Sequence, residues 1–159
     1  MRLFVCLLAV LLAGCGFHLR GLNASQPLAF STLYLNPANP ALSDILRQSL
    51  MLQPNLKLAP AAQGADAELR IESESIEEQV LTVNRSGRVA EYQLTYRTSF
   101  SLRSGERSLI APSSLIVRRD LSFDETKVLS KEAEKAVLIR DMRNDAAQQI
   151  LRRLAAVRP

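Results

Sequence analysis

The sequence predicts an α+β fold: a two-layer sandwich in which two helices cover one face of an antiparallel or mixed sheet of about four strands. Residues 67–123 contain long runs of alternating apolar and polar side chains, separated by turn sequences around Gly87 and Gly105. Residues 39–53 and the segment that ends near Val157 instead repeat apolar residues at helical spacing. A sheet with one apolar face needs a cover, and two amphipathic helices provide it.

The first strand and the first helix are expected near the start of the domain. Leu28–Leu35 is rich in apolar, aromatic and β-branched residues and is closed by an Asn-Pro turn, as expected of a strand. Asn39 suits the N-cap of a helix, and Pro40 suits its first position, where the missing N–H has no helical partner. Pro54 should end this helix near Gln53.

The next strand follows a short, weaker alternation. Residues 55–60 predict at most an edge strand. From Ala67 to Val83 the alternation predicts a half-buried strand, with a twist or bulge near Glu77–Glu78, where the pattern slips. The two faces are expected to carry Ala67, Leu69 and Ile71 on the apolar side and Glu68, Arg70, Glu72 and Glu74 on the polar side.

Two more strands complete an antiparallel meander. The second strand of the meander places five apolar or aromatic side chains on one face, interrupted only by Thr98: Tyr92, Leu94, Tyr96, Phe100 and Leu102. Leu109–Phe123 forms the third, with an interruption at Pro112. Its apolar face carries Leu115, Val117, Leu121 and Phe123. The opposite face of the meander stays polar.

The last segment predicts the longest helix, which begins between Ser122 and Ser130 and ends near Val157. The sequence from Ser122 to Glu125 resembles a capping box, and Ser130 is an alternative cap. The apolar stripe of this helix is Ile139, Met142, Ala146, Ile150 and Leu154. This stripe is expected to cover the sheet rather than to form a membrane or cofactor surface.

The N-terminal residues predict export and lipid attachment. Residues 1–14 combine a basic start with an apolar run too short to span a bilayer, which is typical of a signal peptide. Leu12-Ala13-Gly14-Cys15 matches the bacterial lipoprotein box, so Cys15 is expected to carry diacylglycerol on sulfur and an acyl chain on nitrogen. A plain signal peptide with an incidental cysteine is the alternative. Gly16, where an Asp would favour the inner membrane, favours the outer membrane, and residues 15–26 form a lipidated tether.

Composition argues against an enzyme. After removal of residues 1–14, 19 basic and 16 acidic side chains remain, and Cys15, once acylated, leaves no free thiol. His18 is the only histidine and lies beside the acylation site, so neither a Ser-His-Asp triad nor a metal site is expected. No cofactor is expected beyond the covalent lipid. Nucleic acid is also excluded, because the domain is exported and its charge is mixed.

The specific motifs resemble the LptE family of lipopolysaccharide-assembly lipoproteins. They are Cys15-Gly-Phe-His-Leu-Arg-Gly21, Gly87-Arg-Val-Ala-Glu-Tyr-Gln93, Phe123-Asp124 and Ala146-Ala-Gln-Gln-Ile-Leu-Arg-Arg153. The resemblance covers essentially the whole mature chain in order. Asn84, at the tip of the hairpin, stands where some relatives have an aromatic residue.

The resemblance implies a non-enzymatic role at the outer membrane. Residues 27–159 would form one LptE-like domain that plugs the lumen of the LptD β-barrel translocon from the periplasmic side. The domain would help this barrel to assemble and to deliver lipopolysaccharide to the outer leaflet. Barrel lumens are polar, so the polar side chains of the strands suit such a plug. They include Glu68, Arg70, Glu72, Glu91, Gln93, Thr95 and Arg97.

Lipopolysaccharide carries phosphates, which guanidinium and ammonium groups bind. The expected lipopolysaccharide-binding cluster is Arg85 and Arg88 at the hairpin tip with Lys127 and Lys131 ahead of the last helix. Arg85 and Lys131 are the leading candidates because they match basic positions in the family motifs. Ordinary solvated charges are the alternative for each of these four residues.

Two rival classes remain open from the sequence. One is a structural lipoprotein that serves another envelope complex, such as the barrel-assembly machinery. The other is a lipid-anchored hydrolase that uses a carboxylate pair, either Glu77 with Glu78 or Asp124 with Glu125.

Overall fold

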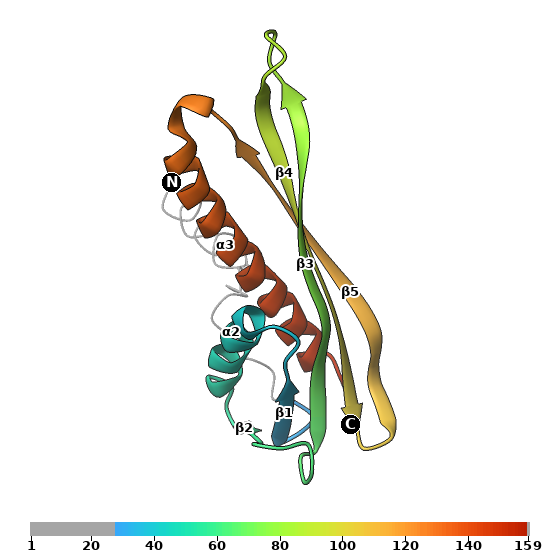
Figure 1. The fold of residues 1–159 in the computed structure, drawn as a ribbon. Helices are drawn as coiled ribbons and strands as arrows, with labels where there is room; N and C mark the ends of the chain where they lie inside the picture. Colours follow the sequence, from blue (N-terminus) through green and yellow to red (C-terminus); the bar gives the residue numbers. More distant parts are fainter. Residues whose placement is uncertain (1–27, 159) are drawn as a thin grey trace, which may run out of the picture.

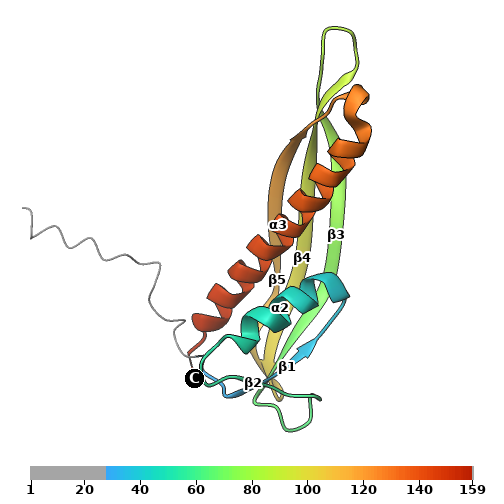
Figure 2. The same ribbon diagram turned by 90° about the vertical axis from the view of Figure 1, so that its left-hand side faces the viewer.

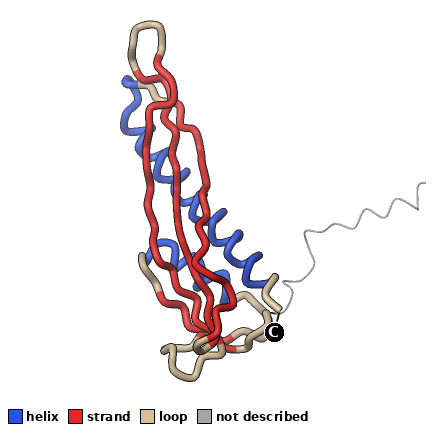
Figure 3. The backbone as a smooth tube through the Cα atoms, turned by 90° about the vertical axis from the view of Figure 1, so that its right-hand side faces the viewer, coloured by secondary structure: helices blue, strands red, loops and turns tan. Residues whose placement is uncertain are grey.

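The computed structural model describes residues 28–158 as an elongated two-layer α+β domain (Figure 1). Two helices lie on one face of a single sheet, and the other face is uncovered (Figures 2 and 3). The predicted fold class is therefore confirmed. The signal peptide, Cys15, His18 and the tether at residues 15–26 lie outside the described residues.

The sheet has five strands in the order β2-β1-β3-β4-β5. Their bounds are Thr32–Asn36 for β1, Lys57–Leu58 for β2, Ala67–Val83 for β3, Val89–Ser104 for β4 and Arg107–Ser122 for β5. Strand β1 pairs in parallel with β2 and β3, while β3, β4 and β5 form the predicted antiparallel meander. The predicted count of about four was one too low, because the two residues of β2 pair fully with β1.

Helix α2 spans Pro40–Met51 and begins as predicted. The side-chain oxygen of Asn39 accepts a hydrogen bond from the Ala41 N–H at 2.9 Å, and Pro40 occupies the first turn. Strand β1, in contrast, begins at Thr32 rather than at Leu28. The carboxylate of Asp66 fixes this start, since it accepts hydrogen bonds from the backbone N–H groups of Ser31 and Thr32 at 2.9 Å each.

Helix α3 spans Val128–Ala155 and follows a single 3₁₀ turn, η1, at Glu125–Lys127. The predicted capping box at Ser122 is wrong, because Asp124 caps η1 through the Thr126 N–H. Ser130 is not a cap either, since its hydroxyl donates to the carbonyl oxygen of Lys127 within the helix. The buried stripe of α3 consists of Met142, Ala146, Ala147, Ile150 and Leu154, close to the predicted one.

The core consists of two hydrophobic clusters along the long axis of the molecule. The larger cluster lies between α2, the end of α3 and the lower half of the sheet, and it includes Leu46, Phe100 and Ile150. The smaller cluster lies farther up, between the middle of α3 and strands β4 and β5. It consists of Leu94, Tyr96, Val117, Leu121, Met142 and Ala146. The alternation predicted for β4 is confirmed, and the interrupting Thr98 is itself buried, with its hydroxyl donating to the Ser73 carbonyl.

A bulge at Glu72 changes the faces of β3. The register skips from the Ile71 pair to the Ser73 pair, so that Glu72 and Ser73 both lie on the uncovered face. Glu74 consequently turns toward the helices, which corrects its predicted position on the polar face. The predicted bulge at Glu77–Glu78 is also wrong, because both residues pair with β4 in continuous register. The alternation of apolar and polar residues is interrupted there because Glu78 is a charged residue that faces α3, where it pairs with Lys135.

Three ion pairs join α3 to the helix-facing side of the sheet. Arg143 lies 2.7 Å from Glu74, whose side chain is only 3% exposed. Lys135 pairs with Glu78 on β3, and Asp145 pairs with Arg119 on β5. The contact with Glu78 raises the pKa of Lys135, mainly through the hydrogen bond between the two groups. The upper part of the helix is therefore held by polar contacts as well as by the smaller cluster.

The buried pair provides a test of this packing. Glu74→Ala leaves Arg143 half-buried without its partner, and we expect the free energy of unfolding to fall by about 2 kcal/mol. The matched control is Glu77→Ala on the opposite face, where the pair with Arg97 is nearly half exposed on both sides. The control should change stability by less than about 0.5 kcal/mol. Equal losses in urea unfolding of the two variants would contradict this assignment.

Candidate functional site

The hairpin between β3 and β4 projects beyond the N-terminal end of α3 (Figure 1). Its tip is ordered by Asn84, whose side-chain oxygen accepts hydrogen bonds from the N–H groups of Ser86 at 2.9 Å and Arg88 at 3.0 Å. Gly87 has φ +77°, a conformation that favours glycine in the turn. Asn84 therefore closes the turn through its amide, which an aromatic side chain at this position cannot do.

The tip is joined to the approach of α3. A guanidinium nitrogen of Arg88 lies 3.2 Å from the carboxylate of Glu125 in η1. The backbone N–H of Phe123 donates to the carbonyl of Ala90 at 2.8 Å, and the ring of Phe123 packs edge-on against Tyr92 with centroids 5.2 Å apart. The hairpin and the turn before α3 therefore form one surface, which we call the distal end.

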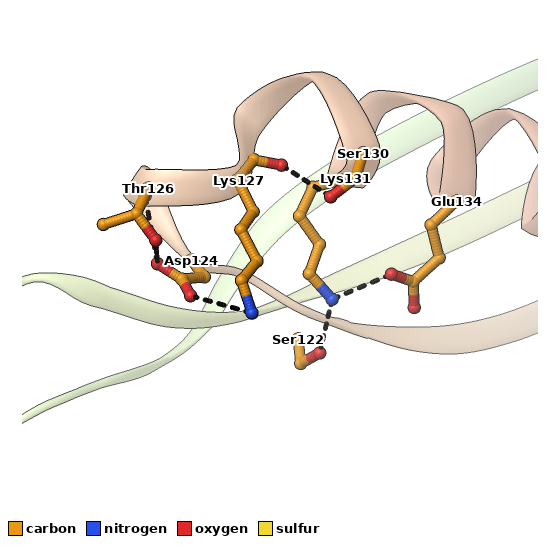
Figure 4. Close-up of polar contacts among 7 residues, drawn as sticks. All are labelled: Ser122, Asp124, Thr126, Lys127, Ser130, Lys131 and Glu134. Atoms are coloured by element: carbon orange, nitrogen blue, oxygen red, sulfur yellow. Dashed lines mark hydrogen bonds and ion pairs between the residues drawn. The ribbon is translucent and has the colours of Figure 1, made fainter.

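Asp124 organises the turn that carries Lys127 (Figure 4). One carboxylate oxygen accepts hydrogen bonds from the Thr126 hydroxyl at 2.7 Å and from the Thr126 N–H at 3.0 Å. These two bonds, with the nearby Lys127 and Lys131, lower the pKa of Asp124 below its ordinary value of 3.8. The Lys127 ammonium lies 4.0 Å from the other oxygen and is well exposed.

Lys131 is held more firmly than the other basic residues of the distal end (Figure 4). Its ammonium group donates to the Ser122 hydroxyl at 2.9 Å and to the Glu134 carboxylate at 2.8 Å. Only 16% of its side chain is exposed. Ser122 thus serves as a partner of Lys131 rather than as a helix cap.

The structure brings the predicted basic residues to the same end of the molecule but gives them different surroundings. Arg88, Lys127 and Lys131 each have an acidic partner within 4.0 Å. Arg85 is exposed and makes no ion pair with any residue in the described range 28–158. The sequence did not reveal these acidic partners, because Glu134 meets Lys131 only when α3 forms and Glu125 meets Arg88 only when the hairpin packs beside η1.

Figure 3 views the sheet from its uncovered face, where the side chains that pair across the strands are polar. Side chains pair across the strands: Gln93 donates to Asp120 at 3.3 Å, Ser101 donates to Glu72 at 2.7 Å, and Arg97 lies 3.5 Å from Glu77. The predicted polar set lies on this face, with Thr95 more buried than expected. The same face carries exposed Ile116 among the polar groups.

Within residues 28–158, neither α-helix combines the length and the apolar composition that a membrane span requires. No group of three or more His, Cys, Asp or Glu side chains in the same range is arranged to hold a metal ion.

The fold defines a class of small bacterial lipoproteins whose structures have been solved. Lipoprotein B from Nitrosomonas europaea is 31% identical, with a TM-score of 0.74 over 89% of this chain and 91% of that one. Rare lipoprotein B from Shewanella oneidensis is 31% identical, with a TM-score of 0.70 over 79% of this chain and 94% of that one.

Sequence relatives give the family. The LPS-assembly lipoprotein LptE of Pectobacterium atrosepticum is 35% identical over 98% of this chain and 86% of that protein. The LptE of Yersinia enterocolitica is 32% identical over 99% of this chain and 76% of that protein. The LptE family model, described as lipopolysaccharide-assembly, matches residues 30–154. The chain therefore belongs to the LptE family of lipopolysaccharide-assembly lipoproteins, which has a non-enzymatic accessory role, and the predicted resemblance is confirmed.

The cap at Asp124 makes stability depend on pH in a defined direction. Folding lowers the pKa of Asp124 below its ordinary value of 3.8. The contribution of its carboxylate to the free energy of unfolding is therefore fully present above pH 3.8 and is lost as the pH falls through the lower pKa of the folded state. We expect Asp124→Ala to be less stable than the wild type at pH 7, and the difference to shrink below about pH 4. Asp124→Asn is the control, because its amide accepts the same hydrogen bonds but does not titrate. A wild-type-to-alanine difference that persists unchanged at pH 2 in urea unfolding would contradict this role.

Proposed function

We propose that the protein is an outer-membrane lipoprotein, acylated at Cys15 after removal of residues 1–14, that occupies the lumen of an LptD-like β-barrel from the periplasmic side. Residues 15–26 would form the tether and residues 27–159 the plug domain. The plug would help the barrel to assemble and would support insertion of lipopolysaccharide into the outer leaflet, with a direct lipopolysaccharide contact at the distal end. Family membership supports the lipopolysaccharide-assembly part of this proposal.

The observation that carries the plug role is the division of the sheet into two unlike faces. The buried apolar side chains of the strands lie beneath α2 and α3, while the opposite face presents paired carboxylate, amide and guanidinium groups. The lumen of a large barrel is polar, so a plug must bury its own apolar residues and offer polar groups outward. The described domain buries its core beneath the helices and offers polar pairs on the other face, while Val80, Leu81 and Val83 near the hairpin and Ile116 on β5 stay exposed.

The lipopolysaccharide contact is proposed for Arg85, Arg88, Lys127 and Lys131. Arg85 leads this set because its guanidinium lies exposed at the tip and has no competing carboxylate within residues 28–158. Arg88 and Lys131 would have to share their charge between a lipid phosphate and Glu125 or Glu134. A doubly charged phosphate is a stronger hydrogen-bond acceptor than a carboxylate. An ion pair between an exposed carboxylate and a basic side chain adds little to stability, so a phosphate can compete with it.

Charge reversal at the distal end tests this contact. We expect the double variant Arg85→Glu with Lys131→Glu to bind lipopolysaccharide at least about tenfold more weakly than the wild type at low salt, because two attractive charges become repulsive. Raising the salt to about 0.2 M should reduce this difference in affinity. Binding is measured with purified lipopolysaccharide, and the unfolding curve of the variant is recorded in parallel.

Two further variants make this result interpretable. Arg118→Glu with Arg140→Glu makes the same change in net charge at exposed positions away from the tip and should leave binding nearly unchanged. Arg85→Glu alone breaks no ion pair in the described domain, so it should weaken binding without loss of stability. Unchanged binding in both Arg85 variants would refute the proposed contact.

A further inference from the structure

The end of the molecule opposite the tip contains an open hollow of about 360 Å³. Its lining residues belong to the start of β5 and to the end of α3. Figure 2 shows that these two segments lie at the same end of the molecule. Three arginines line it: Arg107 from β5, and Arg153 and Arg158 from the end of α3 and the residues after it. Ser108, Leu109 and Val157 also contribute to its wall.

The charge of this hollow is unbalanced. No carboxylate lines it, and none of its three arginines makes an ion pair within the described part of the chain. Arg153 is held in place by Phe100, since its guanidinium carbon lies 5.6 Å from the centre of that ring. An arginine near a helix C-terminus complements the helix dipole, and this explains why Arg153 stands in the last turn of α3. It does not explain Arg107, which belongs to strand β5.

A neighbouring hollow shows the contrast. It lies on the uncovered face and is lined by Arg70 and Arg103 together with Glu72 and Glu106. Its two cations and two anions compensate one another locally. Of these two hollows within residues 28–158, the one at Arg107 concentrates positive charge that no lining carboxylate compensates.

The chemistry of the hollow suits a phosphate group on an amphipathic molecule. Guanidinium groups bind phosphate oxygens in pairs, and the hydroxyl of Ser108 is a further donor. Leu109 and Val157 are only partly buried and give the wall an apolar component. A headgroup joined to acyl chains uses both kinds of surface.

The position of the hollow indicates which phosphate it meets. Leu28, where the described chain begins, packs against the same core cluster as Leu109 and Val157. Cys15 precedes Leu28 by 13 residues, which span at most about 45 Å. Helix α3, with 28 residues, is about 42 Å long and separates this end from the distal end. The chain therefore enters the described domain at the end that carries the hollow.

We propose that the hollow framed by Arg107, Arg153 and Arg158 binds the phosphate of an anionic phospholipid in the leaflet that holds the acylated N-terminus. This contact orients the domain on the membrane surface and is separate from the lipopolysaccharide contact at the distal end. It rests on the proposed acylation of Cys15. Labelling with radioactive palmitate, compared between the wild type and Cys15→Ala, tests that premise independently.

Vesicle binding by the mature chain, residues 15–159 with Cys15→Ser, tests the phosphate site. Both core clusters lie within residues 28–158, so this chain contains the whole described core. We expect it to bind phosphatidylcholine vesicles that contain phosphatidylglycerol more tightly than phosphatidylcholine alone. Arg107→Gln with Arg158→Gln should reduce this binding on the order of tenfold. The control with the same net charge, Arg118→Gln with Arg140→Gln, should reduce it less than about twofold.

The other outcomes each overturn the proposal. Equal losses in the two double variants would show a general charge effect, and equal binding to both vesicle types would show no anion preference. Displacement by inorganic phosphate at matched concentration would indicate a site for the free anion. Loss of lipopolysaccharide binding alone in the Arg107 variant would assign the hollow to that ligand. Arg85→Glu with Lys131→Glu should keep phospholipid binding, so failure at the distal end is distinguishable from failure here.

Discussion

The structure depends on the burial of one apolar face of a long, narrow sheet. Strands β3, β4 and β5 are too few to enclose a core by themselves, so their apolar side chains must lie against another layer. Helix α3 runs along the meander and supplies that layer, while α2 completes it at the lower end. Each large apolar side chain removed from water contributes about 1.5–3 kcal/mol, so the contact of Phe100 and Leu102 on the sheet with Ile150 and its neighbours on α3 dominates the stability of the domain.

The polar contacts between α3 and the sheet have a different consequence. When an ion pair is buried, the loss of hydration offsets much of the attraction between the two charges, so the pair of Glu74 and Arg143 adds little net stability although removal of one partner is costly. The hydroxyl of Tyr96 and one Glu74 oxygen are buried without hydrogen-bond partners among the described residues. Burial, with the charge of Glu74, raises the pKa of Tyr96 above its ordinary value. The upper half of α3, with fewer apolar contacts, is therefore expected to open more readily than the lower half.

Local patterns predicted most of the fold. Alternation located β3, β4 and β5, helical spacing located the stripe of α3, and the chemistry of Asn39 and Pro40 located the start of α2. What the sequence did not reveal depends on pairing between distant segments. The two residues of β2 become a strand only beside β1, and the bulge at Glu72 depends on the register with β4. Strict alternation from Ala67 places Glu74 on the polar face, and only the bulge at Glu72 turns it toward the helices.

The two proposed binding surfaces also differ in how far the sequence could predict them. The basic residues of the distal end were identified from the family motifs, and the structure adds their acidic partners. The hollow at Arg107 had no sequence signal, because its arginines come from segments nearly fifty residues apart that meet only after α3 has packed on the sheet. Arginine-rich segments are common on solvated surfaces, so composition by itself did not distinguish this group.

Site-specific photocrosslinking in cells tests most directly whether the uncovered face of the sheet contacts a barrel. Adjacent residues of β4 offer the comparison, since Arg97 lies exposed on that face and Tyr96 is fully buried beneath α3. An azidophenylalanine at position 97 should form an adduct with the LptD-like barrel, while the same residue at position 96 should form none. No adduct from position 97, or an adduct with a component of the barrel-assembly machinery instead, would contradict this account.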